Sequence, residues 1–332
     1  MDKLVFFLLS LSVSYSAAAE YRAEVVKTWT LPADFKINKK KVGGLSGCSI
    51  FENRIYVISD DRGSQGGPRI ISFKYDPDKN EIDFNNSEVI KVKPSISQKI
   101  LDLEGIGIVS RDQFLLSTEG DLNQRPRIMP EIYWVNSKGE KTSVIQFPKS
   151  FLPERSGKQM QGIQLNQGFE GLVIDADLKK WAAILEAPLM QGPKILSLVE
   201  SDLNSANFDR VYSYPQPVDT DVTSLSGYFG ASAMLIINEA NFLILERGVE
   251  ASLQGLTYRT QLCTATKAGG LALNRSCFYS MNNDAKVTAK FPHGANFEGL
   301  CWVNKQKKLL ITVSDNNFSK NEKSVFILYQ LN

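Results

Sequence analysis

The segment Phe169-Glu-Gly-Leu-Val-Ile-Asp-Ala-Asp-Leu-Lys-Lys-Trp-Ala-Ala-Ile-Leu-Glu186 contains the pattern that decides the fold. An acidic residue opens a short apolar run, a polar turn follows around Asp177, and a second apolar run ends in a carboxylate. Two short apolar runs joined by a polar turn are typical of an antiparallel hairpin. Because the second strand of a hairpin returns to the level where the first began, we expect Glu170 and Glu186 at the same end.

The same pattern occurs five times along the chain, which indicates a repeat architecture. The copies span residues 44–60, 103–119, 169–186, 231–246 and 297–315. Their opening polar residues are 58, 66, 62 and 66 positions apart, and they are Ser46, Glu104, Glu170, Ser232 and Glu298. A period of this length suits a four-stranded blade with long loops. We therefore predict an all-β, five-bladed β-propeller, with six blades as the alternative.

The strands outside the hairpins predict how the ring closes. Two more strand-like runs follow each hairpin, as at 131–136 and 142–147 in the second unit. The fifth unit has only one, at 324–331, whereas segment 22–31 offers a spare strand. We predict that this N-terminal strand completes the last blade, which leaves no exposed sheet edge. Two segments are expected to be long loops, 151–167 and 265–290.

The beginning of the chain predicts export. Asp2 and Lys3 precede an apolar run at 4–13, and Ala17-Ala18-Ala19 has the small-residue pattern of a secretory cleavage site. We assign residues 1–19 to a signal peptide and 20–332 to one propeller domain, in a secreted or periplasmic protein. The apolar run is shorter than the roughly 18 residues of a membrane span, and no later stretch approaches that length.

The net charge of the chain limits the classes of partner that we expect. The formal net charge is +2, which gives no broad electrostatic reason to expect nucleic acid or membrane binding. We expect a monomer that binds a small molecule, without an integral membrane segment.

Four cysteines in an exported chain are able to form disulfides. Cys263 and Cys277 flank a stretch that contains Gly and Thr, and they could join one hairpin. Cys48 and Cys301 hold nearly matching places in two copies of the repeat, and they could bridge neighbouring blades. Buried free thiols are the alternative for each pair.

The opening polar residues are the candidate metal ligands. In a propeller the first strand of each blade lines the axis, so Glu104, Glu170 and Glu298 should converge with the hydroxyls of Ser46 and Ser232. No basic residue is expected beside these three carboxylates. Two carboxylates about 5 Å apart repel by roughly 3 kcal/mol at an effective dielectric of 20, so a cation or protonation must relieve the repulsion.

The ligand chemistry favours calcium as that cation. Oxygen ligands without nearby His or Cys favour a hard ion, and calcium tolerates an irregular ring better than magnesium does. The alternative is that these acids only bind backbone donors in a packed core.

The residues that end the second strands are the candidate catalytic and substrate-binding groups. The acids are Asp60, Asp61, Glu119, Glu186, Glu246 and Asp315, and beside them lie Arg62, Arg247, Asn316 and Asn317. Acids and arginines at one rim could position a phosphate ester and its attacking water while a metal neutralises developing charge. Ordinary strand-end turns are the alternative. The single histidine, His293, excludes a multi-histidine metal site.

Nine motifs in order, over about residues 42–330, resemble the phytase esterase-like family. They are Gly-Leu-Ser-Gly, Ile-Ser-Asp-Asp-Arg, Asp-Leu-Glu-Gly-Ile, Ser-Thr-Glu-Gly, Gly-Phe-Glu-Gly-Leu, Glu-Ala-Pro-Leu, Leu-Glu-Arg-Gly, Asn-Phe-Glu-Gly-Leu and Val-Ser-Asp-Asn-Asn-Phe. The resemblance implies a phosphoester substrate. More distantly, the inner-strand order Ser, Glu, Glu, Ser, Glu and the Asp60-Asp61-Arg62 turn resemble the apyrase-type calcium-activated nucleotidases. That likeness implies calcium at the ring and nucleotide phosphates near the turn.

These observations lead to one expected function and two alternatives. We expect a calcium-dependent hydrolase of a phosphoester, in which Asp60 and Asp61 orient water while Arg62 and Arg247 bind phosphate. The alternatives are an apyrase-like nucleotidase and a noncatalytic propeller in which calcium is structural and the rim binds a ligand or protein.

Overall fold

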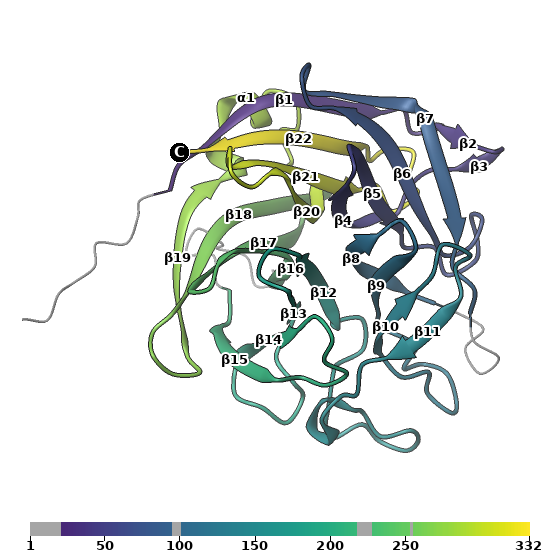
Figure 1. Cartoon of the computed structure of the whole chain (residues 1–332), viewed down its shortest axis with the longest axis vertical. Helices are drawn as coiled ribbons and strands as arrows, with labels where there is room; N and C mark the ends of the chain where they lie inside the picture. Colours follow the sequence, from purple (N-terminus) through teal and green to yellow (C-terminus); the bar gives the residue numbers. More distant parts are fainter. Residues whose placement is uncertain (1–20, 95–100, 218–227, 253–254) are drawn as a thin grey trace, which may run out of the picture.

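Five four-stranded antiparallel sheets surround a central axis (Figure 1). The computed structural model describes residues 21–94, 101–217, 228–252 and 255–332. The sheets are the five blades that the repeat predicts, so the five-bladed propeller is confirmed. The predicted signal peptide, 1–19, lies outside the described residues. No helix in the described ranges has the length and apolarity needed to cross a membrane.

The repeated hairpin provides the two innermost strands of every blade, because its apolar runs become buried strands and its polar centre becomes the turn. Blade 1 contains β4 (Leu45–Phe51), β5 (Arg54–Ser59), β6 (Arg69–Asp76) and β7 (Glu81–Lys91). Blade 2 contains β8 (Leu103–Ser110), β9 (Gln113–Thr118), β10 (Glu131–Val135) and β11 (Lys141–Val144). Blade 3 contains β12 (Phe169–Asp175), β13 (Lys180–Leu185), β14 (Ile195–Asp202) and β15 (Arg210–Pro215).

The last two blades differ in length and in closure. Blade 4 contains β16 (Tyr228–Asn238), β17 (Asn241–Ser252), β18 (Gly255–Lys267) and β19 (Leu273–Ser280). Blade 5 contains β20 (Asn296–Asn304), β21 (Leu309–Asp315), β22 (Ser324–Leu331) and, outermost, β1 (Ala23–Leu31). β1 pairs with β22 from Ala23 opposite Leu331 to Leu31 opposite Ser324. The predicted closure by the N-terminal strand is therefore confirmed.

Short elements occupy the connections. A small hairpin of β2 (Lys36–Ile37) and β3 (Lys40–Lys41) lies between β1 and β4, and the helical turns are η1 (Lys149–Phe151), η2 (Met281–Asn283) and α1 (Ala285–Thr288). Residues 152–168 contain no named strand, as predicted for a loop. The predicted loop at 265–290 is wrong in part, because Leu273–Ser280 pairs with β18 as the outer strand of blade 4.

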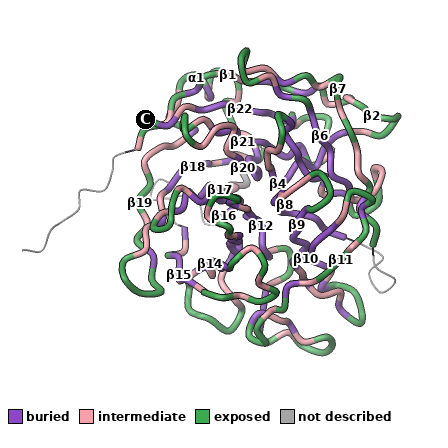
Figure 2. Tube along the Cα trace, viewed as in Figure 1, coloured by how far each residue is buried: buried purple, intermediate pink, exposed green. Residues whose placement is uncertain are grey.

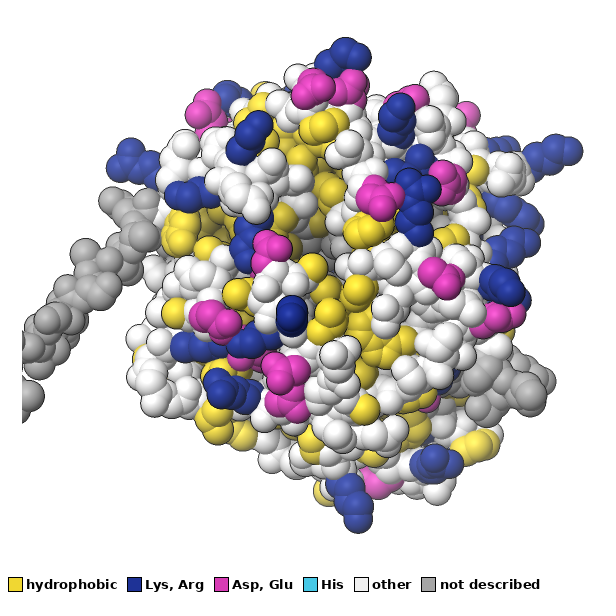
Figure 3. All heavy atoms as spheres, in the orientation of Figure 1, with side chains coloured by type: hydrophobic (Ala, Val, Ile, Leu, Met, Phe, Trp, Pro, Cys, Tyr) yellow, Lys and Arg dark blue, Asp and Glu magenta, His cyan; other side chains and the backbone are white. Residues whose placement is uncertain are grey.

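Blades are joined by apolar packing and by disulfides. The strands nearest the axis are largely buried, whereas exposed residues gather in the connecting loops (Figure 2). Cys48–Cys301 links the inner strands of blades 1 and 5, and Cys263–Cys277 links β18 to β19. Both predicted pairings are therefore present. On the face seen in Figure 3, basic and acidic side chains are interspersed, in keeping with the small net charge.

Candidate functional site

Each blade has a β-bulge at the residue predicted to face the axis. The register between the first two strands shifts between residues 45 and 48, 103 and 106, 169 and 171, 231 and 233, and 297 and 299. The residues within these shifts include Ser46, Glu104, Glu170, Ser232 and Glu298. A bulge adds a residue to one strand and re-aims its side chain, and bulges are common beside active sites. The five equivalent positions thus share one backbone distortion.

The second strands bring four acids and one arginine to the same level. Backbone hydrogen bonds or pairing place Asp60 opposite Gly44, Glu119 opposite Asp102, Glu186 opposite Gly168 and Asp315 opposite Asn296. In blade 4 the residue at this place is Arg247, which pairs with Gly230.

Glu246 does not join the other acids, which corrects its predicted place at the rim. It pairs with Ala231, one residue earlier than Arg247, and side chains alternate between the two faces of a strand. Its buried carboxylate accepts hydrogen bonds from Arg275 at 2.6 and 2.7 Å, from Tyr214 and from Gln261. Glu246 therefore stabilises the packing of blades 3 and 4 away from the axis.

Arg247 balances the charge on one side of the axis. Its Nη2 lies 2.6 Å from Glu186 Oε1, and its Nη1 lies 3.1 Å from Glu298 Oε1 and 2.6 Å from Asn296 Oδ1. The expectation that no basic residue lies beside the three ring glutamates is therefore wrong for Glu298. The guanidinium of Arg247 is held by Glu186, Glu298 and Asn296, so it is not free to bind a phosphate.

The other side of the axis holds acids with which Arg247 forms no ion pair. Carboxylate oxygens of Asp60, Asp102 and Glu104 lie within 4.8 Å of one another, as do those of Glu104, Glu119 and Glu170. We call these five residues the acidic cluster. Within the described ranges, one oxygen each of four of them is buried and has no hydrogen-bond partner: Asp60 Oδ1, Asp102 Oδ1, Glu119 Oε2 and Glu170 Oε2.

Few donors compensate the acidic cluster. Ser46 Oγ lies 2.9 Å from Glu104 Oε2 and from the Glu104 carbonyl, and the Gly168 amide donates to Glu119 Oε1. Arg62 forms an ion pair with Asp102, and about half of its side chain is exposed. Ser232 is not among these donors, because its hydroxyl donates to the Phe297 carbonyl at 3.1 Å.

Burial and mutual repulsion raise the pKa values of Asp60, Glu104, Glu119 and Glu170. Burial raises the pKa of Glu104 and of Glu170 well above the usual range, and neighbouring carboxylates raise both further. Burial with the charges of Glu186 and Asp102 raises the pKa of Glu119 to about 8. Burial with the contact to Asp102 raises the pKa of Asp60 to about 10. The metal-free cluster therefore retains protons at neutral pH.

The metal-free protein is expected to lose stability as pH rises from about 5 to 8. A carboxyl whose pKa is higher in the folded than in the unfolded chain binds protons preferentially in the folded chain. Its contribution is thus complete below the ordinary pKa near 4 and is lost as pH approaches the folded value, at about 1.4 kcal/mol per pH unit for each such group. Urea unfolding in EDTA at several pH values measures this slope. A free energy of unfolding that stayed constant or rose would contradict it.

Three other predicted residues serve the turns that follow their strands. Asp61 is buried and accepts from the amides of Gly63, Gln65 and Gly67 and from Arg69 Nη1. Asn316 Oδ1 accepts from the amides of Gly44 and Phe318, whereas the exposed Asn317 contacts Glu322. The oxygens of Asp61 are thus already used by its own loop.

The sequence carried a signal for two residues that were not predicted at the site, Asp102 and Asn296. Each stands two positions before a ring glutamate, and residues two apart in a strand face the same side. Asp102 enters the acidic cluster, and Asn296 Nδ2 donates to Glu298 Oε1 at 2.8 Å. The corresponding positions of the other blades are glycines.

A pocket of about 450 Å³ borders the ring at blade 5. It includes Asn296 and Asp315 from the ring together with Tyr258, Lys290, His293 and Lys323. The backbone carbonyl of His293 accepts from the Tyr258 amide, so this histidine is held in the pocket wall. The pocket thus combines apolar, cationic and acidic groups.

Fold and site together define a five-bladed propeller with a buried acidic cluster at the axis. A family model described as "Phytase-like: Esterase-like activity of phytase" matches residues 40–318, and the chain belongs to this family. Among curated proteins no relative matches the chain.

Solved structures give weak similarities of overall fold. One is the Bacteroides ovatus xyloglucan PUL GH43B, with 10% identity and a TM-score of 0.46, covering 91% of this chain and 54% of that one. Another is the calcium structure of Trichoderma reesei Carbohydrate-Active Enzymes Family AA12, with 12% identity and a TM-score of 0.45, covering 96% and 98%. The chain spans about half the length of the Bacteroides protein.

Proposed function

We propose that this chain is an exported calcium-dependent hydrolase of phosphoesters. The observation that carries the proposal is the acidic cluster, with four buried carboxylate oxygens that lack partners within the described ranges. The family description, which names an esterase-like activity of phytase, supports the substrate class. Two disulfides and the signal-like residues 1–19 support export.

The donor set fits calcium. The cluster offers only carboxylate oxygens, with the Ser46 hydroxyl nearby, and hard cations prefer such ligands. Glu104, Glu119 and Glu170 would hold the ion, with Asp60 and Asp102 beside Glu104. Glu298 is a weaker candidate ligand than predicted, because Arg247 already neutralises it. A bound calcium ion would polarise a phosphoryl oxygen and offset its negative charge.

The protein's own groups would bind and orient the substrate. Arg62 would bind the phosphate. It contacts Asp102 and Asn166, but about half of its side chain is exposed, whereas Arg247 is engaged by Glu186 and Glu298. Asp60 is only half-buried and would orient the attacking water, a role for which Asp61 has no free oxygen. The pocket beside Asp315 would receive the rest of the substrate.

Two alternative functions are also consistent with this site. An apyrase-like nucleotidase is favoured by the inner-strand order of Ser and Glu residues and by Asp60-Asp61-Arg62. A noncatalytic propeller with a structural ion is favoured by the burial of Glu104, Glu119 and Glu170, which are each less than 10% exposed. The choice of substrate and the presence or absence of turnover distinguish the phosphoesterase, the nucleotidase and the noncatalytic propeller.

Hydrolysis of a substrate panel tests the proposal. Phosphomonoesters, phosphodiesters and nucleoside di- and triphosphates are assayed with calcium and with EDTA. We expect calcium-dependent turnover of at least one class. The Arg62→Ala variant is expected to raise KM about tenfold or more, because a charge-assisted hydrogen bond to phosphate contributes about 1.5–3 kcal/mol.

The control is Arg111→Ala. Arg111 is exposed at the β8–β9 turn, where it pairs with Glu52 of the β4–β5 turn. This substitution should leave KM unchanged. Absence of turnover on every substrate, together with an increase in Tm on adding calcium, would establish the noncatalytic alternative instead.

A further inference from the structure

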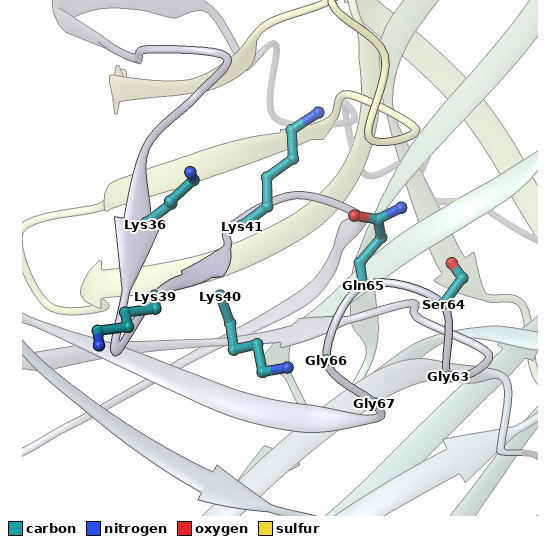
Figure 4. Close-up of a pocket in the computed structure, with 9 residues that line it drawn as sticks. All are labelled: Lys36, Lys39, Lys40, Lys41, Gly63, Ser64, Gln65, Gly66 and Gly67. Carbon is teal, nitrogen blue, oxygen red and sulfur yellow. The ribbon is translucent and has the colours of Figure 1, made fainter.

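A basic pocket of about 560 Å³ lies between the β2–β3 hairpin and the loop that follows Arg62 (Figure 4). Its lining residues are Lys36, Lys39, Lys40, Lys41 and the loop Gly63-Ser64-Gln65-Gly66-Gly67. We call this the lysine pocket. In Figure 4, Lys40 extends toward Gly66, whereas Lys39 points away from the loop.

The positive charge of the lysine pocket is not balanced by the protein. No acidic side chain lines it, and none of its four lysines forms an ion pair within the described part of the chain. Lys41 Nζ donates to the Phe318 carbonyl, which is neutral. Asp61, the acid of the adjoining loop, is already paired with Arg69. Like charges around one concavity repel, so a bound anion would stabilise the pocket.

The loop that faces the lysines leaves room for a ligand, and its free donors are side chains, because the amides of Gly63, Gln65 and Gly67 already donate to Asp61. Gly63, Gly66 and Gly67 have φ values of 112°, 142° and 89°, which residues with a Cβ rarely adopt. A Cβ at Gly63 or Gly67 would meet nothing within 4 Å, so these positions face open space. Ser64 and Gln65 add a hydroxyl and a carboxamide to the same wall. The pocket therefore offers neutral donors opposite its lysines.

We propose that the lysine pocket binds a soluble anion that carries several phosphate groups. A single phosphate is small relative to the pocket, whereas linked phosphates can contact the hairpin and the loop at once, and each added charge strengthens the attraction. None of the residues that line the pocket belongs to the acidic cluster, although the loop begins three residues after Asp60. Anion binding there does not depend on the proposed hydrolysis.

Isothermal titration with tripolyphosphate and with orthophosphate tests this site. The protein is used in EDTA, so that metal at the acidic cluster does not contribute. We expect tripolyphosphate to bind at least about tenfold more tightly than orthophosphate, with affinity falling as salt increases. The exposed pair Lys36→Glu and Lys40→Glu should weaken tripolyphosphate binding by about tenfold or more.

The matched control is Lys138→Glu with Lys158→Glu, an exposed pair outside the pocket that changes the net charge equally. It should alter the affinity by less than about threefold, which is the size of a long-range screened effect. Equal weakening by both pairs, or no binding of tripolyphosphate by the unmodified protein, would overturn the proposal. If the double substitution Lys36→Glu and Lys40→Glu lowers Tm, the double substitution Lys36→Gln and Lys40→Gln gives the same comparison.

The Arg62→Ala variant distinguishes the lysine pocket from the proposed hydrolytic site. It should impair hydrolysis and leave tripolyphosphate binding intact.

Discussion

Replacement of Glu170 with glutamine is expected to weaken calcium binding by about 100-fold or more, because even outer-shell changes at metal sites cost about 10- to 100-fold. Glu170 is buried, its Oε2 has no partner within the described ranges, and it lies among the carboxylates of Glu104 and Glu119. The same change should stabilise the metal-free protein at pH 8, since the folded chain no longer has to keep this carboxyl protonated or tolerate its repulsion of the neighbouring acids. Titration calorimetry with calcium and urea unfolding in EDTA measure the two effects.

The comparison variant for Glu170 is Glu298→Gln. Glu298 holds an equivalent place in blade 5, but Arg247 and Asn296 already bind its Oε1. We expect it to lower calcium affinity less than about tenfold and, unlike Glu170→Gln, to destabilise the metal-free protein, because Arg247 loses a partner. Equal calcium affinity for Glu170→Gln and the unmodified protein would show that the ion does not bind at the acidic cluster.

Replacement of Arg247 with methionine is expected to cost about 3–5 kcal/mol of folding free energy, as breaking a buried ion pair usually does. The change leaves Glu186 and Glu298 buried without the guanidinium that lies 2.6 and 3.1 Å from them. Urea unfolding at pH 8 measures the loss.

A second substitution identifies the cause of that loss. Adding Glu298→Gln to the Arg247 variant should recover part of the free energy, because one uncompensated charge is removed. Arg111→Met, at an exposed ion pair, should cost less than about 1 kcal/mol. A loss below that value for Arg247→Met would mean that solvent, rather than Arg247, compensates these acids.

Much of the fold was predictable because its information is local. Each hairpin is contained in fewer than twenty consecutive residues, and the alternation of side chains fixes which residues face the axis. The spare strand at 22–31 and the matching places of Cys48 and Cys301 added the closure and one disulfide.

The asymmetry of the site was not predictable from spacing. Ser232 precedes Glu246 by the same number of residues as Ser46 precedes Asp60, yet the structure places Arg247 at the equivalent position. The number of residues between two positions does not show which strand of a hairpin contains a bulge. A shift of one residue along a strand turns its side chain to the opposite face of the sheet. The acidic cluster lies to one side because Arg247 reaches Glu186 and Glu298.

The pairing of β1 with β22 has a consequence for the order of folding during synthesis. β1 precedes the other described strands in the chain, and it finds its hydrogen-bonding neighbour only when the segment up to Leu331 has been made. Until then β1 and the incomplete fifth blade expose unpaired edges, and such edges favour aggregation. We infer that completion of the ring is a late, long-range step, and that the nascent chain is most vulnerable just before it.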